Sequence, residues 1–379
     1  MRILFVQRGH PYYTAELSSA LASMGHDVGI VMWEANPDFV GTGVGDRNEE
    51  YRSILHPGVQ LEFVRVPERT FSRGIGGNVS AIARMCKLMR RHKPDVLHLH
   101  DEGDYRIFAA AMLCRRRFPI VLTVHDARIH PGYSRHKAWF AGPWLRKAAD
   151  CIIAHGSDIR TRLLAEGGVS EGKVFCIPHG PYTIYRRWMS AANCEEAKVL
   201  FFGRVYEYKG LDYLIRAAPI VRRQIPDATF VIAGSGPDWP RCKALIESPE
   251  CFILREEKVC EPEVTKLFEE ASVVVLPYVE ASQSGVLMIA YALGKPVIVT
   301  NVGSLTEVVD DGRTGLVVPP RDEVALAGAI VRLLENEDLR KAMGAEGYAK
   351  ATSGDLSWGS IAAKTTDVYE AAIAERTRT

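Results

Sequence analysis

Three charged residues stand where apolar runs end. Arg204 and Lys209 follow the run at 198–203 and precede a helical pattern, and Glu280 follows the run at 272–277. Cations beside a helix N-terminus suit a diphosphate, because free backbone N–H groups and full side-chain charges act on the same anion. The spacing therefore indicates a diphosphate site. Solvated loop charges remain the alternative for Arg204 and Lys209.

The turn after Glu280 has a composition that suits an anion. It reads Ser-Gln-Ser-Gly, and it opens an expected helix at 285–293. Small residues let backbone amides approach an anion at the helix N-terminus, where the dipole favours negative charge. Because phosphate repels a carboxylate, Glu280 is expected to face a neutral, hydroxyl-rich group attached to the phosphate. A first-turn helix cap is the alternative for Glu280.

Short apolar runs alternate with helical patterns along the whole chain. In the first half, strands are expected at 2–6, 27–32, 60–66, 95–100, 120–125, 151–154 and 173–178. In the second half, they are expected at 198–203, 229–234, 251–254, 272–277, 296–300 and 315–319. Apolar strands without alternation, each followed by a helix, predict parallel sheets that are buried on both faces. The fold class is therefore α/β, with two Rossmann-like, doubly wound domains that face a central cleft. Ligands of such sheets bind outside the carboxyl ends of the strands.

The length of 379 residues exceeds what one hydrophobic core usually supports. We expect an N-terminal domain at 1–188, a second domain at 189–356, and a final helix at 357–379 that crosses back to the first domain. The net charge of +1 argues against nucleic-acid binding. The oligomeric state stays open.

The sequence also bears on location. Its first apolar run is too short for a signal peptide, and no run approaches the roughly 18 apolar residues of a membrane span, so a cytoplasmic protein is expected. Residues 135–147 interleave basic residues with Trp139, Phe140 and Trp144. Such a face can lie peripherally on the inner face of a membrane. Packing of the tryptophans inside the domain is the alternative.

Taken together, these features resemble glycosyltransferase family four, which has the GT-B fold. The matching features are Phe-Gly-Arg-x5-Lys-Gly at 202–210, the glycine turn at 234–236, the Glu before a Gly-bearing turn, Gly-Lys-Pro-Val-Ile at 294–298, and the segment 301–322. The segments 123–126 and 145–167 add to the resemblance in the first half. The likeness covers nearly the whole chain. It places the chain with members whose turn reads Ser-Gln-Ser-Gly-Val.

The resemblance implies retaining transfer of a sugar from a nucleoside diphosphate sugar, linked to UDP or GDP, to a hydroxyl acceptor. It also implies that the domain at 1–188 binds the acceptor and that the domain at 189–356 binds the nucleotide sugar. The enzyme would be a hexosyl- or glycosyltransferase (EC 2.4 class) of polysaccharide, glycolipid or glycoconjugate biosynthesis, with a sugar, a lipid-linked sugar or a small molecule as acceptor. The implied catalytic residues are Arg204, Lys209, Glu280 and His125. The implied donor-binding residues are Gly203, Gly234, Ser284, Gly285, Val286 and Glu307. The implied acceptor-side residues are Gly9, His10, His100 and Asp101.

The implied chemistry needs neither a metal nor a cofactor. Fixed positive charge stabilises the departing diphosphate, and a leaving phosphate oxygen takes the acceptor's proton in the front-face mechanism proposed for retaining members. The chain has no Asp-x-Asp, so we expect Arg204 and Lys209 to replace a metal ion. The histidines and carboxylates at 98–104 are not interpreted as a metal site; His100 and Asp101 are expected to be polar groups that line the cleft.

One departure from the family pattern leaves other functions open. The family's second Glu, which binds ribose, would fall at Met288 or Ile289, and neither can accept a hydrogen bond. Ribose must then be held by Glu307 or by the polar side chains of the turn. A catalytically silent binding subunit stays open for this reason. A nucleotide-sugar epimerase is a further alternative, although it would be expected to carry more carboxylates in the cleft.

Overall fold

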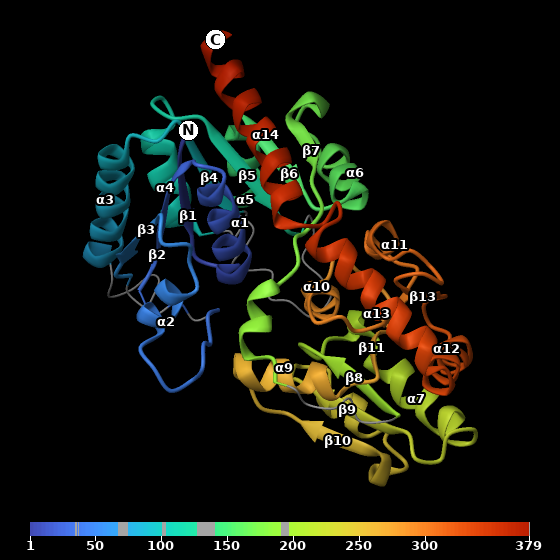
Figure 1. The fold of residues 1–379 in the computed structure, drawn as a ribbon. Coiled ribbons are helices and arrows are strands. Elements are labelled where there is room, and N and C mark those ends of the chain that lie inside the picture. The colour runs from blue at the N-terminus through green and yellow to red at the C-terminus, as the bar shows by residue number, and fades with distance from the viewer. Residues whose placement is uncertain are drawn as a thin grey trace. The chain divides into compact units, whose positions relative to one another are not determined.

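The computed structural model describes residues 1–34, 36, 38–66, 75–100, 104–126, 141–190 and 197–378. The described chain forms two units (Figure 1). Unit 1 consists of the residues up to 178 together with 358–378, and unit 2 consists of residues 179–357.

Unit 1 contains a seven-stranded parallel sheet with the order β3-β2-β1-β4-β5-β6-β7. Its strands are β1 (Arg2–Gln7), β2 (Asp27–Trp33), β3 (Val59–Val64), β4 (Val96–His100), β5 (Ile120–Val124), β6 (Cys151–Ala154) and β7 (Val174–Cys176). Its helices are α1 (Pro11–Ser23), α2 (Arg47–Ser53), α3 (Ile75–His92), α4 (Tyr105–Cys114), α5 (Ala141–Ala148), α6 (Ser157–Ala165), the 3-10 turn η1 (Glu171–Lys173) and α14 (Trp358–Arg378).

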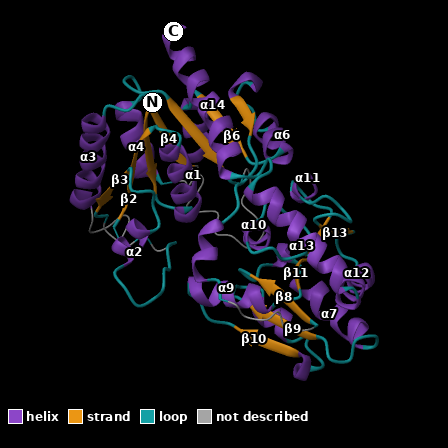
Figure 2. Ribbon diagram, in the orientation of Figure 1, coloured by secondary structure: helices purple, strands orange, loops and turns teal. Residues whose placement is uncertain are grey.

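Strand β4 shows how the sheet of unit 1 separates two environments. Successive side chains of a strand point to opposite faces. Leu97 and Leu99 therefore join the apolar core formed with α3, α4 and α5, whereas His98 and His100 face α1 and α14. Helices α1 and α14 contact each other on that second face, as the ribbon in Figure 2 allows the reader to follow. The final helix thus belongs to unit 1.

Unit 2 contains a six-stranded parallel sheet with the order β10-β9-β8-β11-β12-β13. Its strands are β8 (Lys198–Phe202), β9 (Thr229–Ala233), β10 (Phe252–Arg255), β11 (Val273–Leu276), β12 (Val297–Thr300) and β13 (Gly315–Val318). Its α-helices are α7 (Leu211–Arg222), α8 (Trp239–Lys243), α9 (Glu261–Glu270), α10 (Gly285–Ala292), α11 (Leu305–Val308), α12 (Glu323–Glu335) and α13 (Glu337–Thr352). Its 3-10 turns are η2 (Thr183–Trp188), η3 (Glu207–Lys209) and η4 (Pro249–Cys251). Two parallel α/β sheets confirm the predicted fold class.

The division between the units falls ten residues before the boundary expected at 188. The turn η2 belongs to unit 2, because hydrogen bonds hold it there. The Thr265 hydroxyl donates to the Tyr185 carbonyl at 2.9 Å, and the Arg186 guanidinium donates to the Ala292 carbonyl at 3.2 Å. These partners come from α9 and α10, and no local sequence pattern predicts these hydrogen bonds. The return to unit 1 begins at Trp358, one residue after the expected 357.

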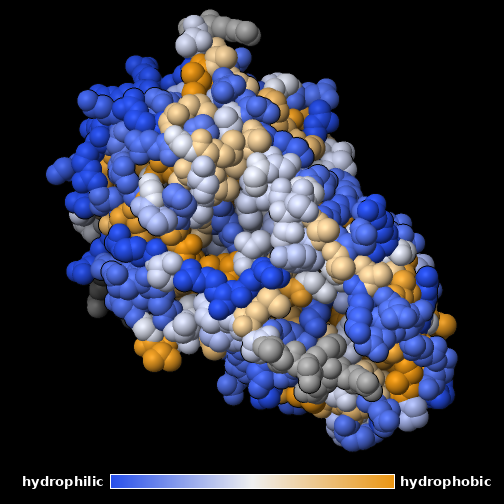
Figure 3. Space-filling model, viewed as in Figure 1, coloured by the Kyte–Doolittle hydropathy of each residue, from blue (hydrophilic) through white to orange (hydrophobic). Residues whose placement is uncertain are grey.

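On the face drawn in Figure 3, hydrophobic residues lie in several separate places among hydrophilic ones. Within the described ranges, no helix is long and apolar enough to cross a membrane. Of the basic and aromatic segment 135–147, residues 135–140 lie outside the described residues. On α5, Trp144 is 62% exposed, whereas Leu145 packs into the core.

Candidate active site

The loops at the carboxyl ends of β8 and β9 touch through glycines. A Cβ on Gly234 would lie 1.9 Å from the Gly203 carbonyl oxygen, so only glycine fits there. Both residues have a positive φ, +145° for Gly234 and +116° for Gly203. The Val205 amide then donates to the Ser235 carbonyl at 2.9 Å. The two predicted glycines therefore lie together at this edge of the sheet.

The turn that carries Lys209 is fixed against the loop that carries Glu280. Gly210 ends the turn η3 with φ +62°, and a Cβ there would lie 2.0 Å from the Pro277 carbonyl oxygen. The Tyr208 carbonyl accepts from the Val279 amide at 2.9 Å and from the Glu280 amide at 3.4 Å. The loops after β8 and β11 thus form one rigid assembly at neighbouring strand ends.

Aromatic rings connect both cations to the first turn of α10. The Lys209 Nζ lies 3.7 Å from the centroid of the Tyr278 ring, a cation–π contact. The Tyr278 hydroxyl lies 3.1 Å from the Ser284 Oγ, which places the ammonium close to the start of α10. The Arg204 guanidinium, which is exposed, lies 5.9 Å from the Tyr206 ring. The rings of Tyr206 and Tyr208 are 6.0 Å apart, so Arg204 and Lys209 flank one aromatic row.

Helix α10 presents its first amides without a side-chain cap from the described residues. Ser284 occupies the N-cap position, but its hydroxyl is engaged with Tyr278 rather than with the helix amides. Amides of this kind are available to an anion. A Cβ on Gly285 would lie 2.9 Å from the Tyr182 ring, so this aromatic residue covers the glycine. Sequence reasoning missed Tyr182, because it comes from a loop about one hundred residues earlier.

The loop after β12 closes against the same turn. A Cβ on Gly303 would lie 1.8 Å from the Ala281 carbonyl oxygen, and the Ser304 amide donates to the Ser282 carbonyl at 3.2 Å. Two polar atoms here, Gln283 Oε1 and Ser304 Oγ, are buried without a hydrogen-bond partner among the described residues.

The two residues at the family's second Glu position are buried. Met288 is 1% exposed and Ile289 is 5% exposed, so both serve the core of unit 2. Glu307, the predicted substitute, lies on the short helix α11 and is exposed. Neither side chain at the second Glu position therefore offers a hydrogen-bond acceptor to ribose.

In unit 1, three of the predicted residues form a compact cluster of rings. His100 Nδ1 lies 2.9 Å from His125 Nε2, at the carboxyl ends of β4 and β5. The His10 ring stacks on the His125 ring, with centroids 3.5 Å apart and planes 10° apart. His100 is 1% exposed and His125 is 2% exposed, so both are more enclosed than the cleft-lining groups we expected. Gly9, which precedes His10 in the sequence, is half-buried. Asp101 lies outside the described residues.

Two further histidines are neutral for a clear reason. Burial lowers the pKa of His98 to about 3 and the pKa of His155 to about 4. His98 is bound on both ring nitrogens, at 2.6 Å to the Tyr369 hydroxyl of α14 and at 2.7 Å to the Thr123 hydroxyl. Among the residues that the structure describes, no group of histidine, cysteine, aspartate and glutamate side chains is placed to hold a metal ion.

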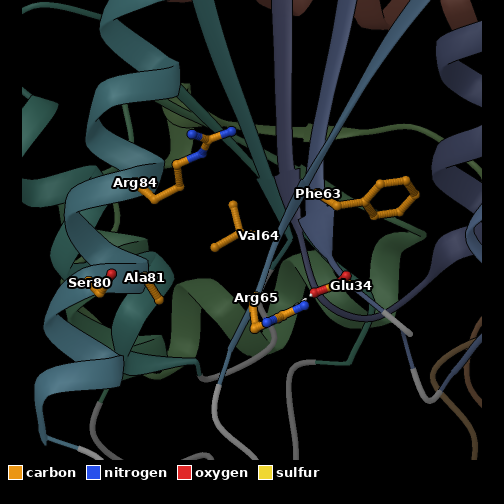
Figure 4. Close-up of a pocket in the computed structure, with 7 residues that line it drawn as sticks. All are labelled: Glu34, Phe63, Val64, Arg65, Ser80, Ala81 and Arg84. Carbon is orange, nitrogen blue, oxygen red and sulfur yellow. Dashed lines mark hydrogen bonds and ion pairs between the residues drawn. The ribbon is translucent and has the colours of Figure 1, made fainter.

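A pocket of about 380 Å³ lies beside the ends of β2 and β3 in unit 1, and sequence reasoning did not indicate it (Figure 4). It is lined by Glu34, Phe63, Val64, Arg65, Ser80, Ala81 and Arg84. The Arg65 guanidinium donates to the Glu34 carboxylate at 3.0 Å, so these charges neutralise each other. None of the predicted site residues lines this pocket.

Comparison with known proteins decides the family. Residues 8–181 match the model described as Glycosyltransferase Family 4, and residues 196–336 match the model described as Glycosyl transferases group 1. The alpha-D-kanosaminyltransferase of Streptomyces kanamyceticus is 30% identical over 70% of this chain and 75% of its own length. The chain belongs to the GT-B glycosyltransferases.

Other relatives of this glycosyltransferase match over nearly its full length. The glycogen synthase of Mycobacterium tuberculosis is 27% identical over 98% of this chain and 95% of its own. The solved structure of Anabaena HepE in complex with UDP-glucose has a TM-score of 0.71, with 16% identity and coverage of 97% and 98% of the two chains. The family models and the sequence relatives favour a glycosyltransferase over the epimerase and the silent subunit.

Proposed function

We propose that this glycosyltransferase moves a sugar from a nucleoside diphosphate sugar to a hydroxyl acceptor with retention of configuration, and that it needs no metal ion. The observation that carries the proposal is the position of Lys209. Its ammonium lies on the Tyr278 ring, and the hydroxyl of that ring reaches Ser284 at the start of α10. The HepE structure, which is a complex with UDP-glucose, supports a UDP-linked donor.

The proposed step balances without a protein base. The bond between the anomeric carbon and the diphosphate oxygen breaks, and its electron pair leaves with that oxygen. The acceptor oxygen forms the new bond on the same face, and its proton passes to the departing phosphate. Arg204, Lys209 and the α10 amides offset the charge that develops on the diphosphate, as preorganised donors do.

Two further residues are proposed to contact the transferred sugar. Glu280 is half-buried, and its backbone amide donates to the Tyr208 carbonyl. Because this hydrogen bond fixes the backbone, the carboxylate is well placed to accept hydrogen bonds from sugar hydroxyls. His125 is proposed to meet another hydroxyl of the same sugar from unit 1. Both roles follow the family resemblance, residue by residue.

Ribose is proposed to bind at the turn itself rather than on α10. Ribose hydroxyls are donors, and Gln283 Oε1 is a buried acceptor without a partner among the described residues. Ser304 Oγ, in the loop that closes on this turn, offers a second such atom. These two residues are proposed to take the place of the missing second Glu.

The biological setting is proposed from the relatives and from the surface. A glycogen synthase among the relatives supports polysaccharide assembly, and a sugar or a lipid-linked sugar would then be the acceptor. The exposed Trp144, with Lys147 Nζ 5.8 Å from its ring, supports peripheral contact of α5 with an inner membrane surface. A cytoplasmic location follows from the same proposal.

One experiment tests the proposal. Purified protein is incubated with UDP- and GDP-sugars and a panel of sugar acceptors, with and without EDTA, and the anomer formed is read by NMR. We expect one donor to give a product with the donor's own anomeric configuration, and EDTA to have no effect. Arg204→Ala is expected to abolish transfer, whereas Arg223→Ala, an exposed arginine at the far end of α7, is the matched control. An inverted product, or activity lost to EDTA, would contradict the mechanism.

A further inference from the structure

We infer that a chain of hydrogen bonds from the Pro11 carbonyl to His125 fixes His125 as the neutral tautomer with its proton on Nε2. The Nδ1 atom of that ring is then an acceptor for a hydroxyl of the transferred sugar, a contact that rests on the proposed function. The chain consists of five hydrogen bonds through Tyr51, Gln7, Thr14 and His100.

The direction of the chain is set at its far end. The Pro11 carbonyl can only accept, so the Tyr51 hydroxyl, 2.9 Å away, must donate its single proton to it. Burial raises the pKa of the Tyr51 hydroxyl, which keeps that proton in place. The Tyr51 oxygen must then accept from the Gln7 amide nitrogen at 3.3 Å. This orientation leaves Gln7 Oε1 to face Thr14.

The same logic continues to the ring of His125. Because Gln7 Oε1 only accepts, the Thr14 hydroxyl donates to it, and its oxygen accepts from His100 Nε2 at 3.0 Å. His100 with its proton on Nε2 carries a lone pair on Nδ1. That lone pair accepts from His125 Nε2 at 2.9 Å. A neutral His125 therefore presents a lone pair on Nδ1, and any sugar hydroxyl that meets this atom donates to it.

Other contacts hold the ring of His125 in one orientation. The His10 ring covers one face, with centroids 3.5 Å apart. The Tyr13 ring meets it edge-on, with centroids 5.1 Å apart and planes 89° apart. His155 lies 4.8 Å away between ring centroids, and Asp126 follows in the chain. The ring is thus constrained in tilt as well as in protonation.

His10, which stacks on His125, has an unfavourable backbone conformation. It has φ 54° and ψ 43°, the left-handed region, which costs a residue with a Cβ about 1 kcal/mol. It stands at the N-cap of α1, yet its side chain makes no cap hydrogen bond. Glycine would fit this backbone without strain. The imidazole at this position contacts the face of His125.

The tautomer is read directly by nitrogen NMR of protein labelled at histidine, with the His125 signals assigned through their loss in His125→Asn. We expect Nε2 to be protonated and Nδ1 to be bare in the wild type. Thr14→Val cuts the chain and is expected to give mixed tautomers, whereas Thr14→Ser keeps the hydroxyl and is expected to preserve the wild-type pattern. A protonated Nδ1 in the wild type, or an unchanged tautomer in Thr14→Val, would overturn the inference.

Kinetics supply a second readout. Thr14→Val is expected to lower kcat about fivefold with little change in the donor KM, and Thr14→Ser to restore it. Tyr51→Phe, at the far end of the chain, is expected to shift the tautomer without touching any sugar, which a purely structural role would not do. If the wild type transfers no sugar at all, the proposed function fails, but the tautomer measurement still decides the inference. If transfer proceeds and Thr14→Val matches Thr14→Ser in both readouts, the inference alone fails.

Discussion

The two sheets end in carboxyl edges of opposite character. At the edge of unit 2, glycines bring loops into backbone contact and two cations flank an aromatic row beside α10. At the edge of unit 1, imidazole and phenol rings are buried in an ordered hydrogen-bond chain, and two of its neighbours, His98 and His155, are neutral. The first edge suits an anion and the second suits neutral hydroxyls. In the proposed function, the same fold recognises two kinds of group through different means, charge in one unit and hydrogen-bond direction in the other.

The largest effect on kcat is expected from loss of Lys209, the cation proposed to lie beside the departing diphosphate. Lys209→Ala should lower kcat by about 10²- to 10³-fold, because one preorganised donor to the developing anion is lost. Transfer rates with a saturating donor measure this. Lys243→Ala is the matched control, since that lysine is exposed on α8 and pairs with Glu256. A loss of only a few-fold in Lys209→Ala would show that the edge of unit 2 does not depend on this cation.

The next effect concerns the backbone contacts of unit 2. Gly210→Ala adds a Cβ 2.0 Å from the Pro277 carbonyl oxygen, in a left-handed residue. Gly312→Ala meets the same backbone strain at φ +75°, but has nothing within 4 Å of the new Cβ. We expect Gly210→Ala to be less stable than Gly312→Ala by about 1–3 kcal/mol in urea unfolding, because a backbone carbonyl cannot move aside cheaply. Equal stabilities would mean that the two loops are not locked together.

The edge of unit 1 should respond to pH rather than to charge removal. His98 and His155 have pKa values lowered by burial, to about 3 and about 4, whereas the unfolded chain binds protons below about pH 6.5. The unfolded state then binds more protons, so stability falls as pH drops from 6.5, by about 1.4 kcal/mol per pH unit for each histidine. Unfolding at pH 7.5 and 5.5 measures the slope. His98→Gln should make it shallower, and an unchanged slope would refute the contribution of this histidine.

The smallest effect is expected on donor binding, at the proposed ribose site around Gln283. Gln283→Ala should raise the donor KM about three- to tenfold, the value of one hydrogen bond. It should have no such effect on a dideoxyribose analogue of the donor, because the hydroxyls that Gln283 binds are absent. Gln224→Ala, an exposed glutamine after α7, serves as the control. Equal losses with both donors would place Gln283 outside the ribose site.

Much of the fold was predictable from sequence, because buried parallel strands leave uninterrupted apolar runs. Each of the thirteen strands in the described part of the chain falls at an expected run, with ends shifted by at most two residues. The boundary at 178 was not predictable, since it depends on hydrogen bonds from η2 to α9 and α10. In the site, Gly203 and Gly234 were indicated by type and position, and their contact explains why no other residue fits.

The parts of the site that sequence reasoning missed all depend on distant partners. Tyr182 covers Gly285, and the Tyr278 ring makes the cation–π contact with Lys209. Neither aromatic residue stands in a sequence pattern that differs from that of an ordinary core position. The sequence pattern likewise gives no sign of function for Gln7, Thr14 and Tyr51, which look like ordinary buried or uncharged residues. Only the folded arrangement reveals that their donors and acceptors form a single directed chain to the histidines.

The membership of α14 in unit 1 affects how the protein is made. The Tyr369 hydroxyl, near the end of the chain, binds His98 in the fourth strand, so the first sheet is finished by the last helix. A ribosome that adds about 5–20 residues per second needs on the order of ten seconds or more to synthesise unit 2 after β7. During that interval the part of the sheet face that α14 covers stays open beside α1, and unit 2 is complete before α14 can close it.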